Sequence, residues 1–184
     1  MTPDLIFTCA DVGIEAAADG VKPRRLRIVA YAGGEMSPAG FPNVIIDLAG
    51  MSLPSTLPIL SDHENTLASI IASGVPSIEG GKLVINAKLA SSSAAEQVVS
   101  LLASGVGLQA SVGCLPIESR RIATKESVTV NGRNFRAGTN GLTVVSRSSL
   151  KEVSVTALGA DSEVAAQCMR RSRRAEIGSA ARGW

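Results

Sequence analysis

Aromatic side chains are scarce in this 184-residue chain, where one Trp, one Tyr and three Phe make up 3% of the residues. Proteins that bind single-stranded nucleic acid or sugars usually stack the ligand on aromatic faces. The chain offers few such faces. The net charge is also small, at +2, and five of the 18 basic residues are arginines within residues 170–184. The near-neutral remainder argues against a duplex-binding surface, so no nucleic-acid partner is predicted.

Cysteine and histidine are equally rare. The three cysteines (Cys9, Cys114 and Cys168) are far apart and form no C-x-x-C pair, which argues against disulfides and metal sites. His63 is the only histidine, so any mechanism that needs two is excluded. No apolar run is long enough to span a bilayer, and the N-terminus lacks the basic-then-apolar pattern of a signal peptide. We therefore predict a soluble protein of a reducing compartment, with no metal, cofactor or membrane partner.

The apolar fraction is 45%, which suits one well-buried domain. Residues 1–25 show little periodicity, and we expect an N-terminal leader or a propeptide there. Residues 26–165 carry the β-like patterns of the domain. A helix is predicted over 162–175, and residues 166–184 are expected to form a basic C-terminal helix or tail.

Strand patterns dominate the domain. The candidates are 26–31, 44–48, 57–60, 68–72 (ended by Gly74 and Pro76), 82–89, 108–115, 142–145 and 150–158, with a type I′ hairpin signal at Asn131-Gly132. One helix is predicted, because Ser93 and Glu96 have capping-box spacing and Gly105 suits a helix end. The strands do not alternate with helices, which argues against a doubly wound sheet. The sequence predicts a mainly β (α+β) fold, a closed or nearly closed β-barrel surrounded by a few helices.

His63 follows the apolar run that ends at Leu60. At a strand end an imidazole can reach a pocket, and its neutral form can accept a proton near pH 7, as a general base must. The alternative is a surface histidine between the acids Asp62 and Glu64. The residues alone favour this plainer interpretation.

Ser111 lies in a strand pattern whose alternation places Leu108, Ala110, Val112 and Cys114 on one face and Gln109, Ser111 and Gly113 on the other. A serine beside a glycine leaves room for a substrate backbone to approach. The alternative is an ordinary small strand residue. Cys114 is a second candidate nucleophile, but it falls on the opposite face, and we assign it to the core.

Glu152 shares a strand face with Ser154 and Thr156, opposite the valines of the same strand. A carboxylate in such a strand can orient an imidazole and stabilise its charged form. The alternative is an outward carboxylate on a half-exposed strand. Asp62 is a competing acid, although a neighbour in an extended chain rarely reaches the adjacent ring.

The order of these segments is similar to that of a known family. The segments are Leu60-Ser61-Asp62-His63-Glu64, the helix end Leu101-Leu102-Ala103-Ser104-Gly105, then Leu108-Gln109-Ala110-Ser111-Val112-Gly113, and last Leu150-Lys151-Glu152-Val153-Ser154-Val155. Over residues 26 to 165 the chain resembles the prohead (capsid maturation) proteases of tailed bacteriophages, which share the fold of the herpesvirus assemblin proteases.

The resemblance implies an assemblin-like serine endopeptidase in which His63 is the base, Ser111 the nucleophile and Glu152 the third member. The herpesvirus relatives use a second histidine as third member, which this chain lacks. The backbone N–H groups around Val112 and Gly113 are the first choice of oxyanion donors. Arg120 or Arg121 is the alternative.

The resemblance also implies a biological setting: an enzyme packaged in the viral procapsid in the host cytoplasm. There it would cleave scaffold protein, capsid protein and itself, as a homodimer. The basic tail would then be a junction to a removed extension or a link to scaffold, although a solvated helix end is the plainer and favoured explanation. Two alternatives stay open: a non-enzymatic scaffold or capsid-assembly component with the same barrel, and a small-ligand-binding barrel.

Overall fold

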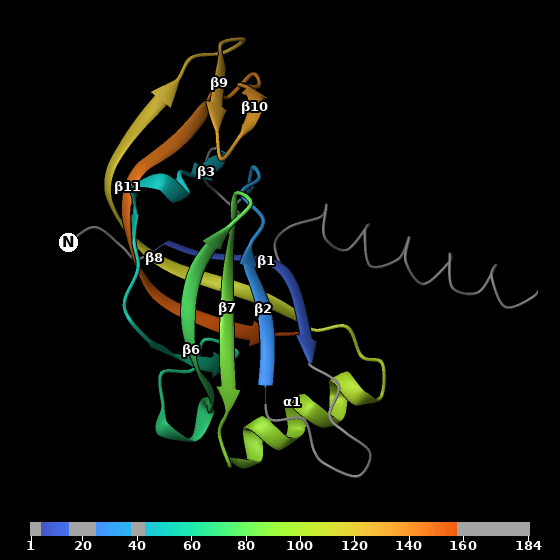
Figure 1. The fold of residues 1–184 in the computed structure, drawn as a ribbon. Coiled ribbons are helices and arrows are strands. Elements are labelled where there is room, and N and C mark those ends of the chain that lie inside the picture. Colours follow the sequence, from blue (N-terminus) through green and yellow to red (C-terminus); the bar gives the residue numbers. More distant parts are fainter. Residues whose placement is uncertain (1–4, 15–24, 38–42, 158–184) are drawn as a thin grey trace, which may run out of the picture.

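The structure is a computed structural model, and it describes residues 5–14, 25–37 and 43–157. The fold is mainly β with few helices (Figure 1). The strands are β1 (Leu5–Ile14), β2 (Arg25–Tyr31), β3 (Val44–Ile46), β4 (Met51–Ser52), β5 (Leu57–Ser61), β6 (Ile70–Glu79), β7 (Lys82–Leu89), β8 (Gln109–Ile122), β9 (Ser127–Val130), β10 (Arg133–Arg136) and β11 (Leu142–Thr156). The helices are α1 (Ser93–Ala103) and two 3-10 turns, η1 (Leu48–Gly50) and η2 (Leu67–Ser69).

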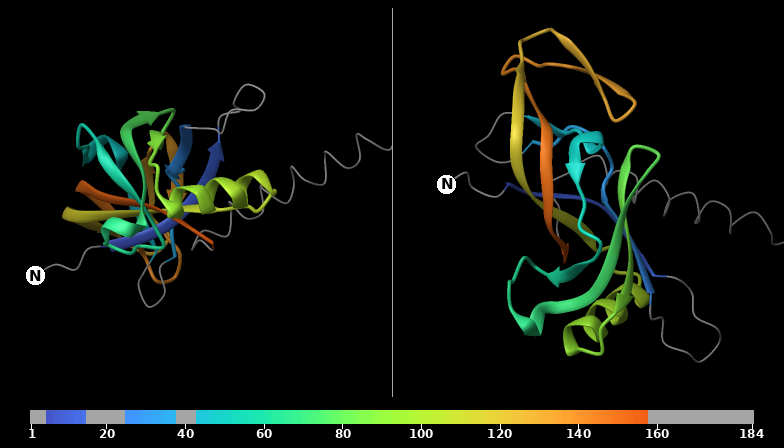
Figure 2. Two further views of the ribbon diagram at one scale, coloured as in Figure 1. Left: turned by 90° about the horizontal axis from the view of Figure 1, so that it is seen from below. Right: turned by 60° about the vertical axis from the view of Figure 1, so that its left-hand side comes forward.

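One sheet holds all strands except the β9–β10 hairpin. Its order is β3-β11-β5-β6-β7-β2-β1-β8, β4 pairs with β11, and β11 also pairs with β8. The sheet therefore curls strongly and forms a half-barrel (Figure 2). The expected curl is present, but the closed barrel is not. A physical reason is that β1 joins β2 only over Val12–Ile14, while β8 and β11 leave the barrel together toward the hairpin.

The concave side of the sheet holds the main core. Alternate residues of β5, β7 and β8 point into it; on β7 these are Leu83, Ile85, Ala87 and Leu89. Val84 is also buried, at 1% exposure, so β7 is covered on both faces at that point. Helix α1 adds Ala95 and Val98 to the same core. The other face of the sheet is called the outer face below.

Residues 1–25, expected to be a leader, contain a strand of the sheet. β1 pairs with β8 and with β2, so this segment is part of the fold. The sequence missed it because the stretch shows little alternation. The predicted helix over 162–175 and the basic segment 166–184 lie outside the described residues.

Two strand predictions were too short. β6 continues through Gly74 and Pro76 to Glu79, although both residues usually end strands. A Cβ at Gly74 would lie 2.4 Å from Ile85 Cγ2, so close packing explains the glycine. β5 pairs with β6 only as far as Gly74, so Pro76 removes no N–H from a ladder on that side. Similarly, 142–145 and 150–158 are parts of the single strand β11, whose bulges interrupt the alternation.

The predicted helix and hairpin are present. α1 starts one residue earlier than expected, because Ser92 is the N-cap and its hydroxyl accepts from Ala95 N–H at 3.2 Å. Asn131 and Gly132 form the β9–β10 turn with φ of 53° and 74°, as the type I′ signal predicts. The hairpin packs on its own small core. No helix within the described ranges is long and apolar enough to cross a membrane.

Candidate active site

Glu152 is placed by a β-bulge in β11. Leu150 pairs with Cys114 and Glu152 with Gly113, so Lys151 is an extra residue in β11. In a regular strand Leu150 and Glu152 would point to the same face. The bulge lets Leu150 enter the core while the Glu152 side chain lies on the outer face. Bulges that redirect a side chain in this way are common next to active sites.

His63 is placed by a left-handed turn directly after β5. Asp62 and His63 have φ of 52° and 62°, a conformation that costs non-glycine residues energy and so needs support. Asp62 N–H provides it by donating to the Val155 carbonyl of β11 at 3.0 Å. The turn thereby fixes the His63 backbone beside β11.

The imidazole of His63 contacts the carboxylate of Glu152. The His63 Nδ1 and Glu152 Oε1 atoms are 2.9 Å apart, and the two side chains are 25% and 23% exposed. A carboxylate oxygen accepts, so the neutral imidazole carries its proton on Nδ1 and leaves Nε2 as the acceptor. This is the arrangement that a histidine base and an orienting acid need. Of the acids the sequence offered, Glu152 and not Asp62 makes this contact.

Ser111 lies on the same face as this pair. Its strand neighbours Ala110 and Val112 belong to the core, so Ser111 points to the outer face. It is the register partner of Ser154, two residues from Glu152. Ser111 is fully buried. A substrate carbonyl therefore reaches its hydroxyl only if groups around it move aside.

Ser154 is a member of the cluster that the sequence did not reveal. Its hydroxyl donates to Glu152 Oε1, the same oxygen that His63 contacts. It is fully buried and lies between Ser111 of β8 and Leu60 of β5 in the ladder. The shared face of Glu152 and Ser154 was visible in the sequence. The hydrogen bond between this hydroxyl and the carboxylate was not.

Gly113 leaves room for the acid, and the expected room for a substrate backbone stays a prediction. A Cβ at this position would lie 3.1 Å from Glu152 Cβ and 3.4 Å from Oε2. Contacts this short would push the carboxylate away. The serine-hydrophobic-glycine pattern is therefore linked to Glu152 through the pairing of β8 with β11.

The oxyanion donors stay a prediction. Val112 and Gly113 lie where β8 pairs with β1 on one side and β11 on the other, so their N–H groups face neighbouring strands. The alternative donors, Arg120 or Arg121, lie too far from Ser111. Arg120 and Arg121 lie nine and ten residues from Ser111 along β8, about 30 Å in an extended strand. Arg121 Nη2 instead donates to the Asn140 carbonyl at 2.8 Å.

Cys114 is buried in the main core, as the alternation predicts. It points away from the outer face that carries Ser111. In the part of the chain that the structure describes, no group of three or more His, Cys, Asp or Glu is arranged to hold a metal ion.

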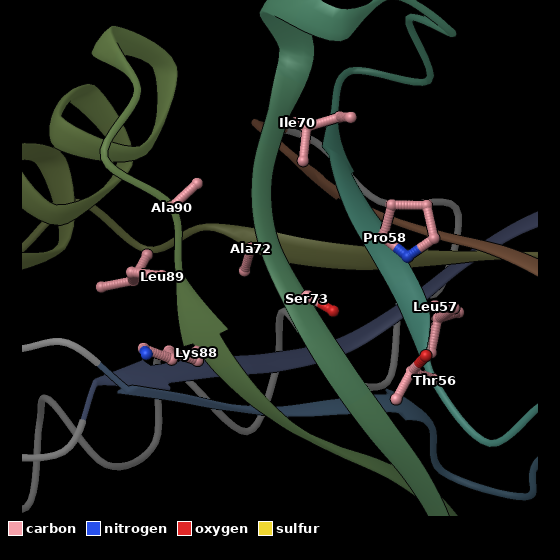
Figure 3. A pocket seen from close by; sticks show the side chains of 9 residues that line it. All are labelled: Thr56, Leu57, Pro58, Ile70, Ala72, Ser73, Lys88, Leu89 and Ala90. Atoms are coloured by element: carbon pink, nitrogen blue, oxygen red, sulfur yellow. The ribbon is translucent and has the colours of Figure 1, made fainter.

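A groove is formed at β5, β6 and β7 (Figure 3), with Pro58, Ser73 and Lys88 from the outer face and Leu57, Ala72 and Leu89 from the main core. Its volume is about 390 Å³. It is lined by Thr56, Leu57, Pro58, Ile70, Ala72, Ser73, Lys88, Leu89 and Ala90. Ile70 begins β6 directly after η2, and η2 ends the loop that starts at His63. The groove is therefore next to the loop that holds the imidazole.

Comparisons with known proteins add no identification. No family model, no curated protein and no solved structure matches the chain.

Proposed function

We propose that the protein is a serine endopeptidase with Ser111 as nucleophile, His63 as general base and Glu152 as the orienting acid. The observation that carries the proposal is the His63–Glu152 contact on the strand face that also carries Ser111. Ser111, His63 and Glu152 are far apart in the sequence and were selected as the members of a catalytic triad. They lie on, or directly after, the strands β8, β5 and β11, which are neighbours in the sheet. The His–Ser–acid chain order differs from those of the common serine hydrolases.

The mechanism is acyl transfer. The Ser111 hydroxyl oxygen attacks a peptide carbonyl carbon while His63 Nε2 takes the hydroxyl proton. The Glu152 carboxylate accepts from Nδ1–H and stabilises the imidazolium. The same proton then passes to the leaving amine as the C–N bond breaks, which leaves an ester on Ser111. Water, deprotonated by His63, hydrolyses the ester and restores the free serine.

The substrates that we propose are scaffold and capsid proteins inside a viral procapsid in the host cell, with cleavage of the chain itself. This part rests on the order of the segments around His63, Ser111 and Glu152 in the sequence. A homodimer is part of the same proposal.

The complete burial of Ser111 favours a second candidate, a capsid-assembly component without turnover. Such a protein would keep the fold and the His63–Glu152 contact but would not open Ser111 to substrate. The two candidates differ in whether the hydroxyl becomes reactive.

The test is covalent labelling of the full chain with a serine-directed phosphonate, followed by peptide mass mapping. We expect one adduct on Ser111, and none on Ser111→Ala or on His63→Ala. Co-expression with the neighbouring capsid and scaffold genes should give trimmed products only with the wild-type chain, because loss of a triad member typically lowers the rate by several orders of magnitude. Absence of both the adduct and the trimming would favour the assembly component.

A further inference from the structure

The outer face of the sheet connects the candidate active site to the groove. Pairings run from Ser111 to Ser154 and on to Leu60 in one row of side chains. Two residues earlier on β5, Pro58 starts a second row that continues through Ser73 and Lys88 to Arg25. Both rows lie on the same face, because their members alternate with core residues.

The second row ends in two cations that face one another. Arg25 of β2 and Lys88 of β7 are register partners, and both are exposed. Like charges directly opposite in a sheet repel. Across the described residues, no hydrogen bond or ion pair engages either side chain. Within residues 5–14, 25–37 and 43–157 nothing offsets the repulsion, which an anion bound between them would relieve.

In the neighbouring row of the same face, the cation has an acidic partner. Arg27, two residues along β2, binds Glu79 at 2.8 Å. A hydrogen bond from Ser77 and the Arg27 guanidinium hold the pKa of Glu79 below its usual value, so the acid stays charged. One outward arginine of β2 is thus neutralised by the protein, while Lys88 and Arg25 have no acidic partner among the residues that the structure describes.

The rest of the groove is suited to side chains of a polypeptide. Its lining is mainly apolar, with the hydroxyl of Ser73 on the strand next to Lys88 and that of Thr56 at the β5 side of the groove (Figure 3). Leu67, in the loop between His63 and the groove, is 89% exposed and adds apolar surface on the way. An apolar surface that ends in cations complements a segment with apolar residues next to a carboxylate.

We propose that this groove, with Lys88 and Arg25, binds an acidic side chain of the substrate and anchors the peptide for cleavage at Ser111. The inference rests on the proposed function. Along the outer face, through β11, β5 and β6, four strand spacings separate β8 from β7, so the path from Ser111 to Lys88 is about 20 Å. An extended peptide covers that distance with about six residues. The preferred substrates therefore carry an acidic residue, flanked by apolar ones, about six residues from the scissile bond.

The test measures binding without catalysis, so that it stays informative if the peptidase proposal fails. The full chain with Ser111→Ala is titrated into fluorescein-labelled Ala-Leu-Glu-Leu-Ala and into its Gln and Lys counterparts, and anisotropy is read. We expect the Glu peptide to bind about fivefold more tightly than the Gln peptide, a difference typical of an exposed charge pair, and to lose that advantage at high salt.

Variants of Lys88 and Arg25 test whether these two residues cause the preference for the Glu peptide. Lys88→Glu should abolish the preference for Glu and favour the Lys peptide, and Arg25→Glu should act in the same direction. Lys82→Glu is the matched control, since Lys82 is an exposed lysine of the same strand and face, away from the groove. Equal binding of the Glu and Gln peptides, or equal effects of Lys82→Glu and Lys88→Glu, would overturn the proposal. Lys88→Gln checks that the loss follows charge and not misfolding.

Discussion

At the scale of single residues, the Glu152 carboxylate is the centre of the candidate site. One of its oxygens contacts both the His63 ring and the Ser154 hydroxyl. Two contacts on one oxygen restrict the rotation of the carboxylate, and with it the orientation of the imidazole. Ser154 supplies no reacting atom in the proposed mechanism, so it is a positioning residue.

Ser154→Ala should lower kcat about tenfold and leave KM nearly unchanged, because substrate contacts stay intact while the carboxylate loses one fixed partner. Steady-state cleavage of a capsid-derived peptide measures both constants. Ser148→Ala is the control: Ser148 is another buried serine of β11, but its hydroxyl has no hydrogen-bond partner among the described residues, so its removal should be neutral. If phosphonate labelling moved from Ser111 to Ser154, the assignment of roles would be wrong.

Sequence reasoning reached part of this site. Alternation correctly placed Ser111 and Gly113 on one face of β8, and Cys114 on the other. The sequence also singled out Glu152 over Asp62 as the acid that reaches the His63 ring, and the structure contains this contact. The role of Gly113 was not predictable, because it depends on which residue of β11 lies opposite, and a one-residue bulge decides that.

At the scale of elements, the β9–β10 turn joins two parts of the fold. Asn131 is one of its two turn residues, and its side chain also reaches the body of the protein. The amide donates to the Ile46 carbonyl at 2.8 Å and to the Gly33 carbonyl at 3.2 Å, while Oδ1 accepts from Leu48 N–H at 2.9 Å. A residue favoured in the turn for its backbone thus also satisfies three backbone groups around β3.

Asn131→Ala should destabilise the protein by about 2–4 kcal/mol, because it loses these hydrogen bonds and puts alanine at positive φ. Asn131→Gly should be milder by about 1 kcal/mol, since glycine removes the backbone penalty alone. Denaturant unfolding followed by circular dichroism measures both. Asn134→Ala in the same hairpin is the control, as its exposed side chain makes only a 3.4 Å bond to Thr129 Oγ1. Equal losses for Asn131→Ala and Asn134→Ala would contradict this role.

The bounds of strands were predicted wrongly where they depend on pairing with a neighbouring strand and not on the local sequence pattern. The alternation of β7 and the caps of α1 are local, and both elements were found close to their actual bounds. The extension of β6 past Gly74 and Pro76 depends on β7 alongside it, and the continuity of β11 depends on β8. Such tertiary support is not encoded in a window of a few residues.

At the scale of the whole molecule, the sheet order determines which residues meet. β5, β11 and β8 are neighbours although long stretches of chain separate them, and this order brings His63, Glu152 and Ser111 to one face. The sequence gives no direct signal of strand order. The mainly β class and the curl were predicted; β1, which lies beside β8, was not.

The pairing of β1 with β8 predicts what removal of the N-terminal segment does. Thr8 of β1 is the register partner of Ser111, so β1 supports the strand that carries the proposed nucleophile. A chain without residues 1–14 would leave the edges of β8 and β2 unpaired at that point, and unpaired edges favour aggregation. We expect this truncated chain to lose phosphonate labelling and to elute as larger species in size-exclusion chromatography.

A peptide of residues 5–14 added in trans should restore labelling in part, because it can pair again with β8 as an added strand. A scrambled peptide of the same composition is the control. Full labelling of the truncated chain without any peptide would contradict a structural role for β1 and would instead agree with a removable leader. Restoration by the native peptide alone would show that the segment belongs to the folded protein and supports β8 by strand pairing.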